Sequence, residues 1–296
     1  MWVFLALLSA ILLGVYDILK KVSLKDNAVL LVLLISTSVG ALIFLPAVII
    51  SNTNPGYAAS FFWYVAPVDR ATHGLILIKS TIVGASWILS YYAMKYLPLT
   101  IVSPIRSTGP LWTLIGALLI FGERLNMLQW TGLITSLFFF WLFSQTGRLE
   151  GFSFRNNKWM WCIYAGTILG SISGLYDKFL LARIDRIVVQ AWFSIYMVPV
   201  ILPFVIAKCF PLHKQSFKWR YTIPLIGVCL TVADYAYFYA LSYPESLISI
   251  VSALRRCSVA VPFLAGAVFF HEKNIRRKAL LLAGMLIGVG FIIWGS

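Results

Sequence analysis

Charged residues are scarce in this sequence, and acidic residues most of all. Only 11% of the 296 residues are charged, with 10 acidic against 24 basic side chains, whereas 60% are hydrophobic. Soluble domains are typically about one quarter charged, so lipid rather than water must surround most of this chain. The polar stretches between apolar runs are short and leave no room for a separate soluble domain. The net charge of +14 falls mainly on these stretches, where it suits anionic lipid head groups rather than nucleic acid.

Cysteine and histidine patterns typical of redox or metal chemistry are also missing. Free buried thiols are expected, because four isolated cysteines lie in or beside apolar stretches: Cys162, Cys209, Cys229 and Cys257. HExxH or comparable ligand spacing is not found among the three histidines, which are His73, His213 and His271. The chain also lacks a GxxxxGK[ST] phosphate loop. We therefore expect no metal ion and no other cofactor.

Long apolar runs are what the sequence has in abundance. Ten of them, divided by short polar stretches, approach the roughly 20 residues that a membrane-spanning helix needs. They cover approximately residues 2–20, 28–50, 73–96, 99–121, 127–145, 159–181, 187–208, 221–242, 246–270 and 278–295. The first run lacks the basic start of a secretion signal, so we expect it to be the first span.

The two halves of the sequence repeat each other. Segment 14–17 (GVYD) returns as 174–177 (GLYD), and 101–106 (IVSPIR) aligns with 250–255 (IVSALR). Both GxYD segments end a stripe of small residues, which lets another helix approach closely. Each half contains five spans, so the second must cross the membrane in the opposite orientation. The sequence thus predicts an all-α integral membrane protein of two inverted five-helix repeats, an architecture typical of secondary transporters.

Several loosely patterned segments also resemble a known family. They are 91–98 (YYAMKYLP), 121–124 (FGER), 239–241 (YAL) and 271–273 (HEK). The chain is similar over nearly its whole length to the EamA-like branch of the drug/metabolite transporter superfamily. This resemblance implies a ten-helix metabolite transporter, with one EamA-like repeat in residues 1–147 and a second, inverted repeat in residues 157–296.

Eight ionisable residues fall inside the predicted spans, where each is costly enough to indicate a function. They are Lys79, Arg106, Lys178, Arg255 and Arg256 among the bases, and Asp17, Asp177 and Asp234 among the acids. Two positive charges remain even if every acid has a partner. Arg106 and Arg255 lie roughly 12 to 15 Å into matching spans, close to the midplane. The excess predicts an anionic or zwitterionic substrate, although the arginines could instead bond to helix-end carbonyls or to Asp234.

The substrate is expected in a central cavity with aromatic walls. Its candidate binding residues are Lys79, Trp87, Tyr92, Arg106, Asp234, Tyr239, Arg255 and Arg256. For any single aromatic side chain, packing or a place at the membrane interface is the commoner role. Asp17 and Asp177 are candidate proton-coupling groups, because a buried carboxylate can take up a proton. Local ion pairs with Lys20 or Lys21, and with Lys178, are the alternative for these two residues.

The predicted function is secondary transport, by export or exchange, of a small metabolite such as an amino acid or organic acid. The metabolite would cross a bacterial-type inner membrane by alternating access. The protein is not expected to be an enzyme. The alternatives are a membrane-embedded enzyme acting on a lipid or isoprenoid, for which no GxSxG or paired histidines are present, and a non-transporting scaffold or receptor. The expected partners are the substrate, the lipid bilayer and, in a coupled mechanism, protons; nucleic acid is not expected, and a homodimer is left open.

The orientation in the membrane is predicted differently by two criteria. Fifteen basic residues fall in the odd-numbered connections and four in the even-numbered ones. The positive-inside rule therefore places both termini outside the cytoplasm. The family resemblance implies that both termini lie inside.

Overall fold

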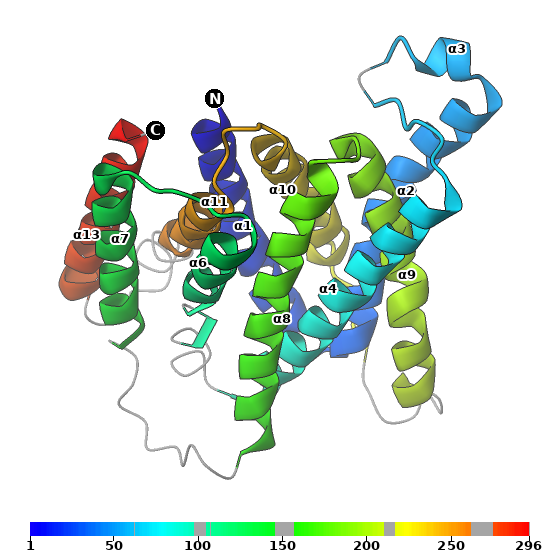
Figure 1. The fold of residues 1–296 in the computed structure, drawn as a ribbon. Coiled ribbons are helices and arrows are strands. Elements are labelled where there is room, and N and C mark those ends of the chain that lie inside the picture. The colour runs from blue at the N-terminus through cyan, green and yellow to red at the C-terminus, as the bar shows by residue number, and fades with distance from the viewer. Residues whose placement is uncertain are drawn as a thin grey trace.

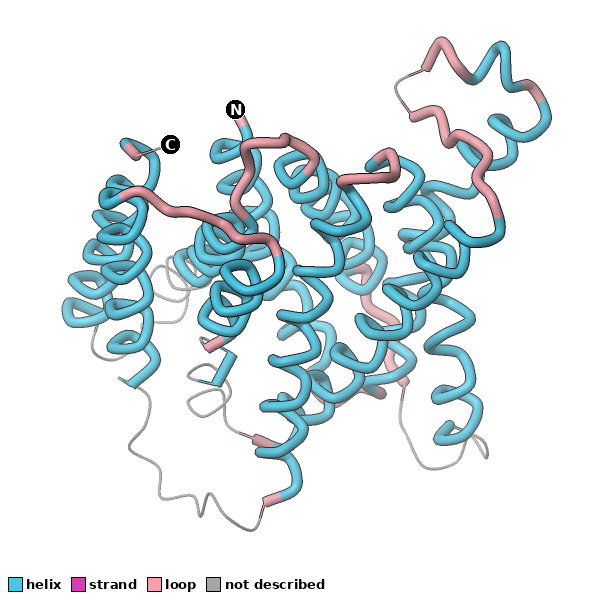
Figure 2. The backbone as a smooth tube through the Cα atoms, viewed as in Figure 1, coloured by secondary structure: helices cyan, strands magenta, loops and turns pink. Residues whose placement is uncertain are grey.

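The computed structural model describes residues 1–61, 63–97, 105–106, 108–145, 157–209, 217–261 and 275–295. All regular structure in these ranges is helical (Figure 2). Five helices are long and apolar enough to cross a membrane: α1 (Trp2–Leu24), α2 (Val29–Thr53), α4 (Arg70–Tyr96), α9 (Arg186–Cys209) and α10 (Thr222–Leu241). The other elements are α3 (Pro55–Ala58), α6 (Gly109–Ile120), α7 (Met127–Gln145), α8 (Lys158–Leu181), α11 (Ile248–Arg256), the 3-10 helix η2 (Cys257–Val259) and α13 (Ile275–Trp294).

The helix boundaries differ from the predicted ones mainly at the ends. Helix α1 continues to Leu24, beyond the predicted end at residue 20, and Lys20 is paired with Asp17 within this helix. The predicted span 246–270 begins as α11 and η2, and its residues 262–270 lie outside the described ranges. The predicted span 99–121 is described from residue 105, except residue 107, and contains α6.

On α1, small side chains face the interior of the bundle and several large apolar ones face outward. On α1, Ala6 and Ala10 are fully buried, whereas Phe4 and Ile11 are exposed. This distribution suits a protein whose outer solvent is lipid and whose helices touch through small residues. A Cβ atom on Gly14 would lie 2.5 Å from the Cβ of Val261. Only glycine therefore permits this approach between α1 and the segment after η2.

The helices pack mainly across the two halves of the chain (Figure 1). Helix α1 packs against α10 and α11, α4 against α8 and α9, and α2 against α9 and α10. Helix α6 packs against α8 and α11, and α7 against α13. Both termini lie at the same end of the bundle (Figure 1). The most extensive contacts therefore join helices that are far apart in the sequence. A cavity lies among these helices.

Candidate functional site

A polar cavity of about 250 Å³ lies in the middle of the helix bundle, lined mainly by α1, α4, α8, α10 and α11. Its walls combine hydroxyl groups with aromatic rings, including Ser86, Ser171, Trp87 and Tyr91. Small residues on α8 make room for it, because Gly170 and Gly174 line the wall. A few polar groups in an otherwise apolar surround are typical of a small-molecule site.

Two ion pairs in the cavity wall join residues of the central helices. Lys79 on α4 lies 2.8 Å from the Asp177 carboxylate on α8, as an ion pair without the alignment of a hydrogen bond. Arg255 on α11 donates a hydrogen bond of 3.1 Å to Asp234 on α10. A buried charge is tolerated only when it is paired. These contacts therefore tie α4 to α8 and α10 to α11.

The Lys79 ammonium is held in an aromatic cage. It is 1% exposed and lies 4.2 Å from the ring centroid of Phe193 and 3.9 Å from that of Phe238. The Tyr237 hydroxyl donates a hydrogen bond of 3.2 Å to the second carboxylate oxygen of Asp177. Each ring adds about 0.5–2 kcal/mol to the binding of a cation, so the cage fixes Lys79 in place.

A third ion pair lies on α1, near the end of the cavity away from the termini. Lys20 is 4% exposed and its ammonium lies 2.8 Å from the Asp17 carboxylate, one helical turn earlier. The same ammonium lies over the rings of Tyr16 and Tyr91, whose hydroxyls are hydrogen-bonded at 2.8 Å. The Tyr16–Tyr91 contact joins α1 to α4 beside the cavity.

Two arginines in the cavity wall form no ion pair with any described residue: Arg106 and Arg256. Their charges repel each other, and Asp17 attracts both, although its closest partner is Lys20. The Nε atom of Arg256 is buried without a hydrogen-bond partner. A Cβ atom on Gly109 would lie 2.9 Å from Nη2 of Arg256, so glycine makes room for the guanidinium there.

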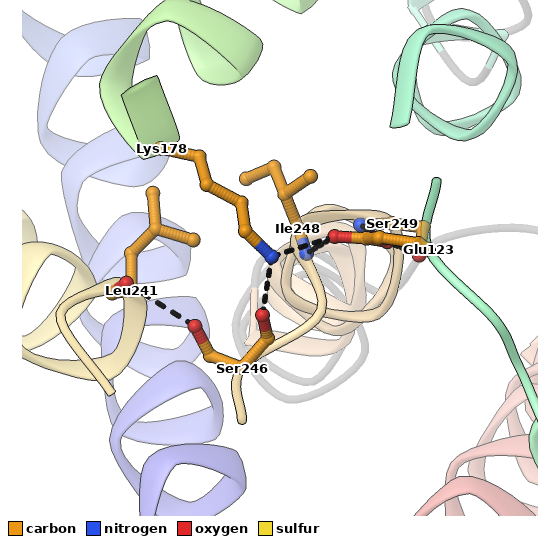
Figure 3. A network of polar contacts seen from close by, with 6 residues as sticks. All are labelled: Glu123, Lys178, Leu241, Ser246, Ile248 and Ser249. Carbon is orange, nitrogen blue, oxygen red and sulfur yellow. Dashed lines mark hydrogen bonds and ion pairs between the residues drawn. The ribbon is translucent and has the colours of Figure 1, made fainter. Parts of the chain in front are cut away.

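A separate polar network closes over the start of α11 at the end of the bundle where the termini lie (Figures 1 and 3). Glu123, in the connection between α6 and α7, is 7% exposed. Its carboxylate accepts hydrogen bonds from the backbone N–H of Ile248 (2.7 Å) and the hydroxyl of Ser249 (2.5 Å), and pairs with Lys178 at 2.8 Å. Lys178 also donates to the Ser246 carbonyl at 2.5 Å. Glu123 thus caps a helix of the other half, where a negative charge is favoured.

Comparison with known proteins identifies the first half of the chain. Residues 1–145 match the model of the EamA-like transporter family. The first half of the chain is therefore similar to the EamA-like transporter family, which belongs to the drug/metabolite transporter superfamily. Its members are membrane transporters of small molecules, which favours transport over the membrane-enzyme alternative. No curated protein matches the sequence.

The second half of this EamA-like protein is also covered by a structural match. A solved structure, described only as the crystal structure of a protein, matches 99% of this chain and 96% of its own length. The TM-score is 0.72 at 14% sequence identity. At this identity the likeness shows a shared fold and carries no information on the substrate.

Most of the predicted binding residues of the EamA-like protein lie together. The cavity is lined by Lys79, Trp87, Arg106, Asp234, Arg255 and Arg256, and also by both predicted proton-coupling residues, Asp17 and Asp177. Two predicted aromatic residues lie outside its wall. Tyr92 stacks on Trp159 with ring centroids 6.1 Å apart, and the Tyr239 ring packs 3.9 Å from the guanidinium of Arg186.

Of the two local ion pairs given above as alternatives, Asp17 with Lys20 is present and Asp177 with Lys178 is not. Lys178 pairs with Glu123 outside the cavity wall, and its sequence neighbour Asp177 pairs with Lys79 instead. Lys20, the last residue of the first predicted span and one of the fifteen basic residues counted with the odd-numbered connections, is buried in α1 and lines the cavity. Because Lys20 takes the place of Lys178, the cavity still has two more positive than negative side chains.

Several cavity residues were not among the binding residues predicted from the sequence. They are Tyr16, Lys20, Tyr91, Phe193, Tyr237 and Phe238. Tyr16 belongs to the repeated GxYD segment, so the repeat itself carried a signal for it. Phe193 lies in an apolar run like any other, and only the packing of α9 against α4 brings its ring to Lys79.

Proposed function

We propose that this EamA-like protein is a secondary transporter that exports or exchanges a small anionic or zwitterionic metabolite. It works by alternating access across a bacterial-type inner membrane, with the central cavity as its substrate site. The observation that carries this proposal is the cavity itself, in which basic side chains outnumber acidic ones among the described residues. Such a lining attracts an anionic group, and arginine is well suited to hold it.

The packing pattern supports a ten-span architecture of two inverted repeats. In this proposal the first repeat contains α1, α2, α4, α6 and α7, and the second contains α8, α9, α10, α11 and α13. The equivalent helices are α1 and α8, α2 and α9, α4 and α10, α6 and α11, and α7 and α13. When the members of each pair are exchanged, the α1–α10 contact becomes α8–α4, α2–α10 becomes α9–α4, and α6–α8 becomes α11–α1. All of these contacts are present. The α2–α9, α6–α11 and α7–α13 contacts are converted into themselves. A twofold relation of this kind is what a rocking mechanism requires.

Polar contacts between the repeats occur at both ends of the cavity. At the end with the termini, Glu123 joins the first repeat to α8 and α11. At the opposite end, the Ser23 and Thr222 hydroxyls are 2.5 Å apart, and the Asn27 amide donates to the Lys218 carbonyl at 2.8 Å. In the proposed cycle these two sets of contacts break in turn, so that the cavity opens to one side at a time.

The distribution of basic residues supports an orientation. The end of α1 and the starts of α8 and α10 lie at the end of the bundle opposite the termini (Figure 1), and the residues at or beside these helix ends include Lys21, Lys25, Lys158, Lys218 and Arg220. We place this end in the cytoplasm by the positive-inside rule. Protease access to a tag on either terminus in oriented membrane vesicles tests the assignment, and a tag that faces the cytoplasm would contradict it.

Counterflow in proteoliposomes tests the proposed function. Vesicles loaded with anionic, zwitterionic, cationic or neutral solutes should exchange labelled anions or zwitterions only when the protein is present. Gly174→Leu fills the cavity wall, where a Cβ atom meets only the Tyr237 hydroxyl at 3.7 Å, and should abolish exchange without unfolding the protein. Gly290→Leu is the matched control, because a Cβ atom there meets nothing within 4 Å. Exchange that is equal in both variants would refute the cavity as the route.

A further inference from the structure

The charges that line the cavity do not balance. Among the described residues its wall contains five basic side chains and three acidic ones. Each acid already has a basic partner within the wall: Asp17 with Lys20, Asp177 with Lys79, and Asp234 with Arg255, at 2.8, 2.8 and 3.1 Å. The remaining bases are Arg106 and Arg256, which have no acidic partner among the described residues.

Neither arginine forms an ion pair with a described acid, and Asp17, which attracts both, is already paired with Lys20 at 2.8 Å. Both arginines are half-buried, and an unpaired arginine within a predicted span is costly. Arg106 and Arg256 also repel each other, and the buried Nε of Arg256 has no hydrogen-bond acceptor. The compensating anion must therefore come from outside the described part of the chain. Because both side chains line the same cavity, one molecule in that cavity can meet both.

We propose that the cavity binds a substrate with two negative charges, held by Arg106 and Arg256. This inference rests on the proposed transport function and specifies the substrate class. The shared chemistry is that of a small dianion, supplied either by a phosphate monoester or by a dicarboxylate. Both present oxygen pairs that a guanidinium binds through two hydrogen bonds, and both are small enough for a cavity of about 250 Å³.

The same arrangement assigns a different role to Arg255. Its guanidinium donates to Asp234 and lies 3.9 Å from the Tyr237 ring centroid. Its charge is therefore already paired within the cavity wall, as the charge of Lys79 is paired with Asp177. In this proposal Arg255 and Lys79 position the cavity helices, and selection for the charge of the substrate comes from Arg106 and Arg256.

The test is a counterflow assay that compares solutes of similar size and different charge. The probes are glycerol 3-phosphate and succinate as the two kinds of dianion, lactate as a monoanion, alanine as a zwitterion, and glycerol as a neutral solute. The variants are Arg106→Gln, Arg256→Gln and the corresponding Lys substitutions. Arg183→Gln is the matched control, because Arg183 is exposed and does not line the cavity.

The native protein should exchange one of the dianions faster than lactate, alanine or glycerol, and which dianion it prefers identifies the source of the charge. Each Gln substitution should lower the ratio of dianion to monoanion exchange about ten- to hundredfold, the usual effect of losing one charge-assisted hydrogen bond. The Lys variants should keep part of this ratio, and Arg183→Gln should keep all of it. Gel filtration in detergent checks that each variant is folded.

The outcomes separate this inference from the function on which it rests. The dianion inference would be overturned if lactate or alanine is exchanged at least as fast as both dianions and neither Gln variant changes the ratio of dianion to monoanion exchange. The proposed transport function would then still stand. No exchange of any probe would contradict the proposed function itself. If a Gln variant does not fold, thermal stabilisation of the native protein decides instead: the dianions should stabilise it more than lactate does, and equal stabilisation would overturn the inference.

Discussion

The ion pair between Lys79 and Asp177 should make the two residues strongly interdependent. Lys79→Met removes the buried cation and leaves the Asp177 carboxylate without its partner at 2.8 Å. Asp177→Asn leaves the caged ammonium without its anion. In the double variant neither charge remains. We therefore expect each single change to be far more damaging than the two together.

The expected size follows from the geometry of the pair. Two unit charges 2.8 Å apart attract each other by about 6 kcal/mol at an effective dielectric constant of 20. This attraction is largely offset by the several kcal/mol that each ion loses in leaving water. Removing one partner alone should cost about 3–5 kcal/mol of stability, whereas neutralising both should cost no more than about 1–2 kcal/mol.

The assay is equilibrium unfolding of the native protein, both single variants and the double variant in mixed micelles with increasing denaturing detergent. The pair between Asp17 and Lys20 is a useful comparison, since the Asp17 side chain is 29% exposed and solvent screening should reduce the coupling. A Lys79→Met protein within about 1 kcal/mol of the native stability would refute the account of a buried, mutually dependent pair.

Three further predictions follow from contacts outside this pair. Glu123→Ala should lower both stability and exchange, because the start of α11 loses its cap and a buried ion pair loses one partner; unchanged exchange would exclude Glu123 from the transport cycle. Tyr16→Phe and Tyr91→Phe should each remove the same 2.8 Å hydrogen bond, so their effects on exchange should not add, and additive effects would contradict a shared contact. Gly132→Val should separate α7 from α13, since a Cβ atom there would lie 2.5 Å from a backbone oxygen of α13; thermal unfolding should show a clear loss against the open-site control Gly290→Val, and equal stabilities would show that this contact is not needed.

Features with local sequence signals could be predicted. The apolar runs predicted the bounds of α1, α2, α4, α9 and α10 to within a few residues, because the length and hydropathy of a span depend only on neighbouring residues. The repeated GxYD segments drew attention to Asp17 and Asp177, and both residues line the cavity. The charge excess was also visible, because an acid-poor chain with many basic residues cannot compensate every charge within its spans.

Features that depend on three-dimensional packing could not be predicted. The partner of Asp177 is Lys79 rather than the adjacent Lys178, because α4 packs along α8 and brings the more distant residue closer. Lys20 was counted with a connection, since a lysine after an apolar run usually ends it. Which arginines of the cavity wall lack an acidic partner among the described residues depends on how its three acids are paired, and this leaves Arg256 rather than Arg255 unpaired.

The central claim is that one cavity is exposed to the two sides of the membrane in turn. Ser171, which lines the cavity and is 5% exposed, can be changed to Cys in a protein whose native cysteines have been replaced by Ser. A membrane-impermeant maleimide should label this cysteine when added from either side, and an exchanged substrate should slow the labelling from both. Labelling from one side only, at a rate that no exchanged substrate changes, would contradict alternating access through this cavity.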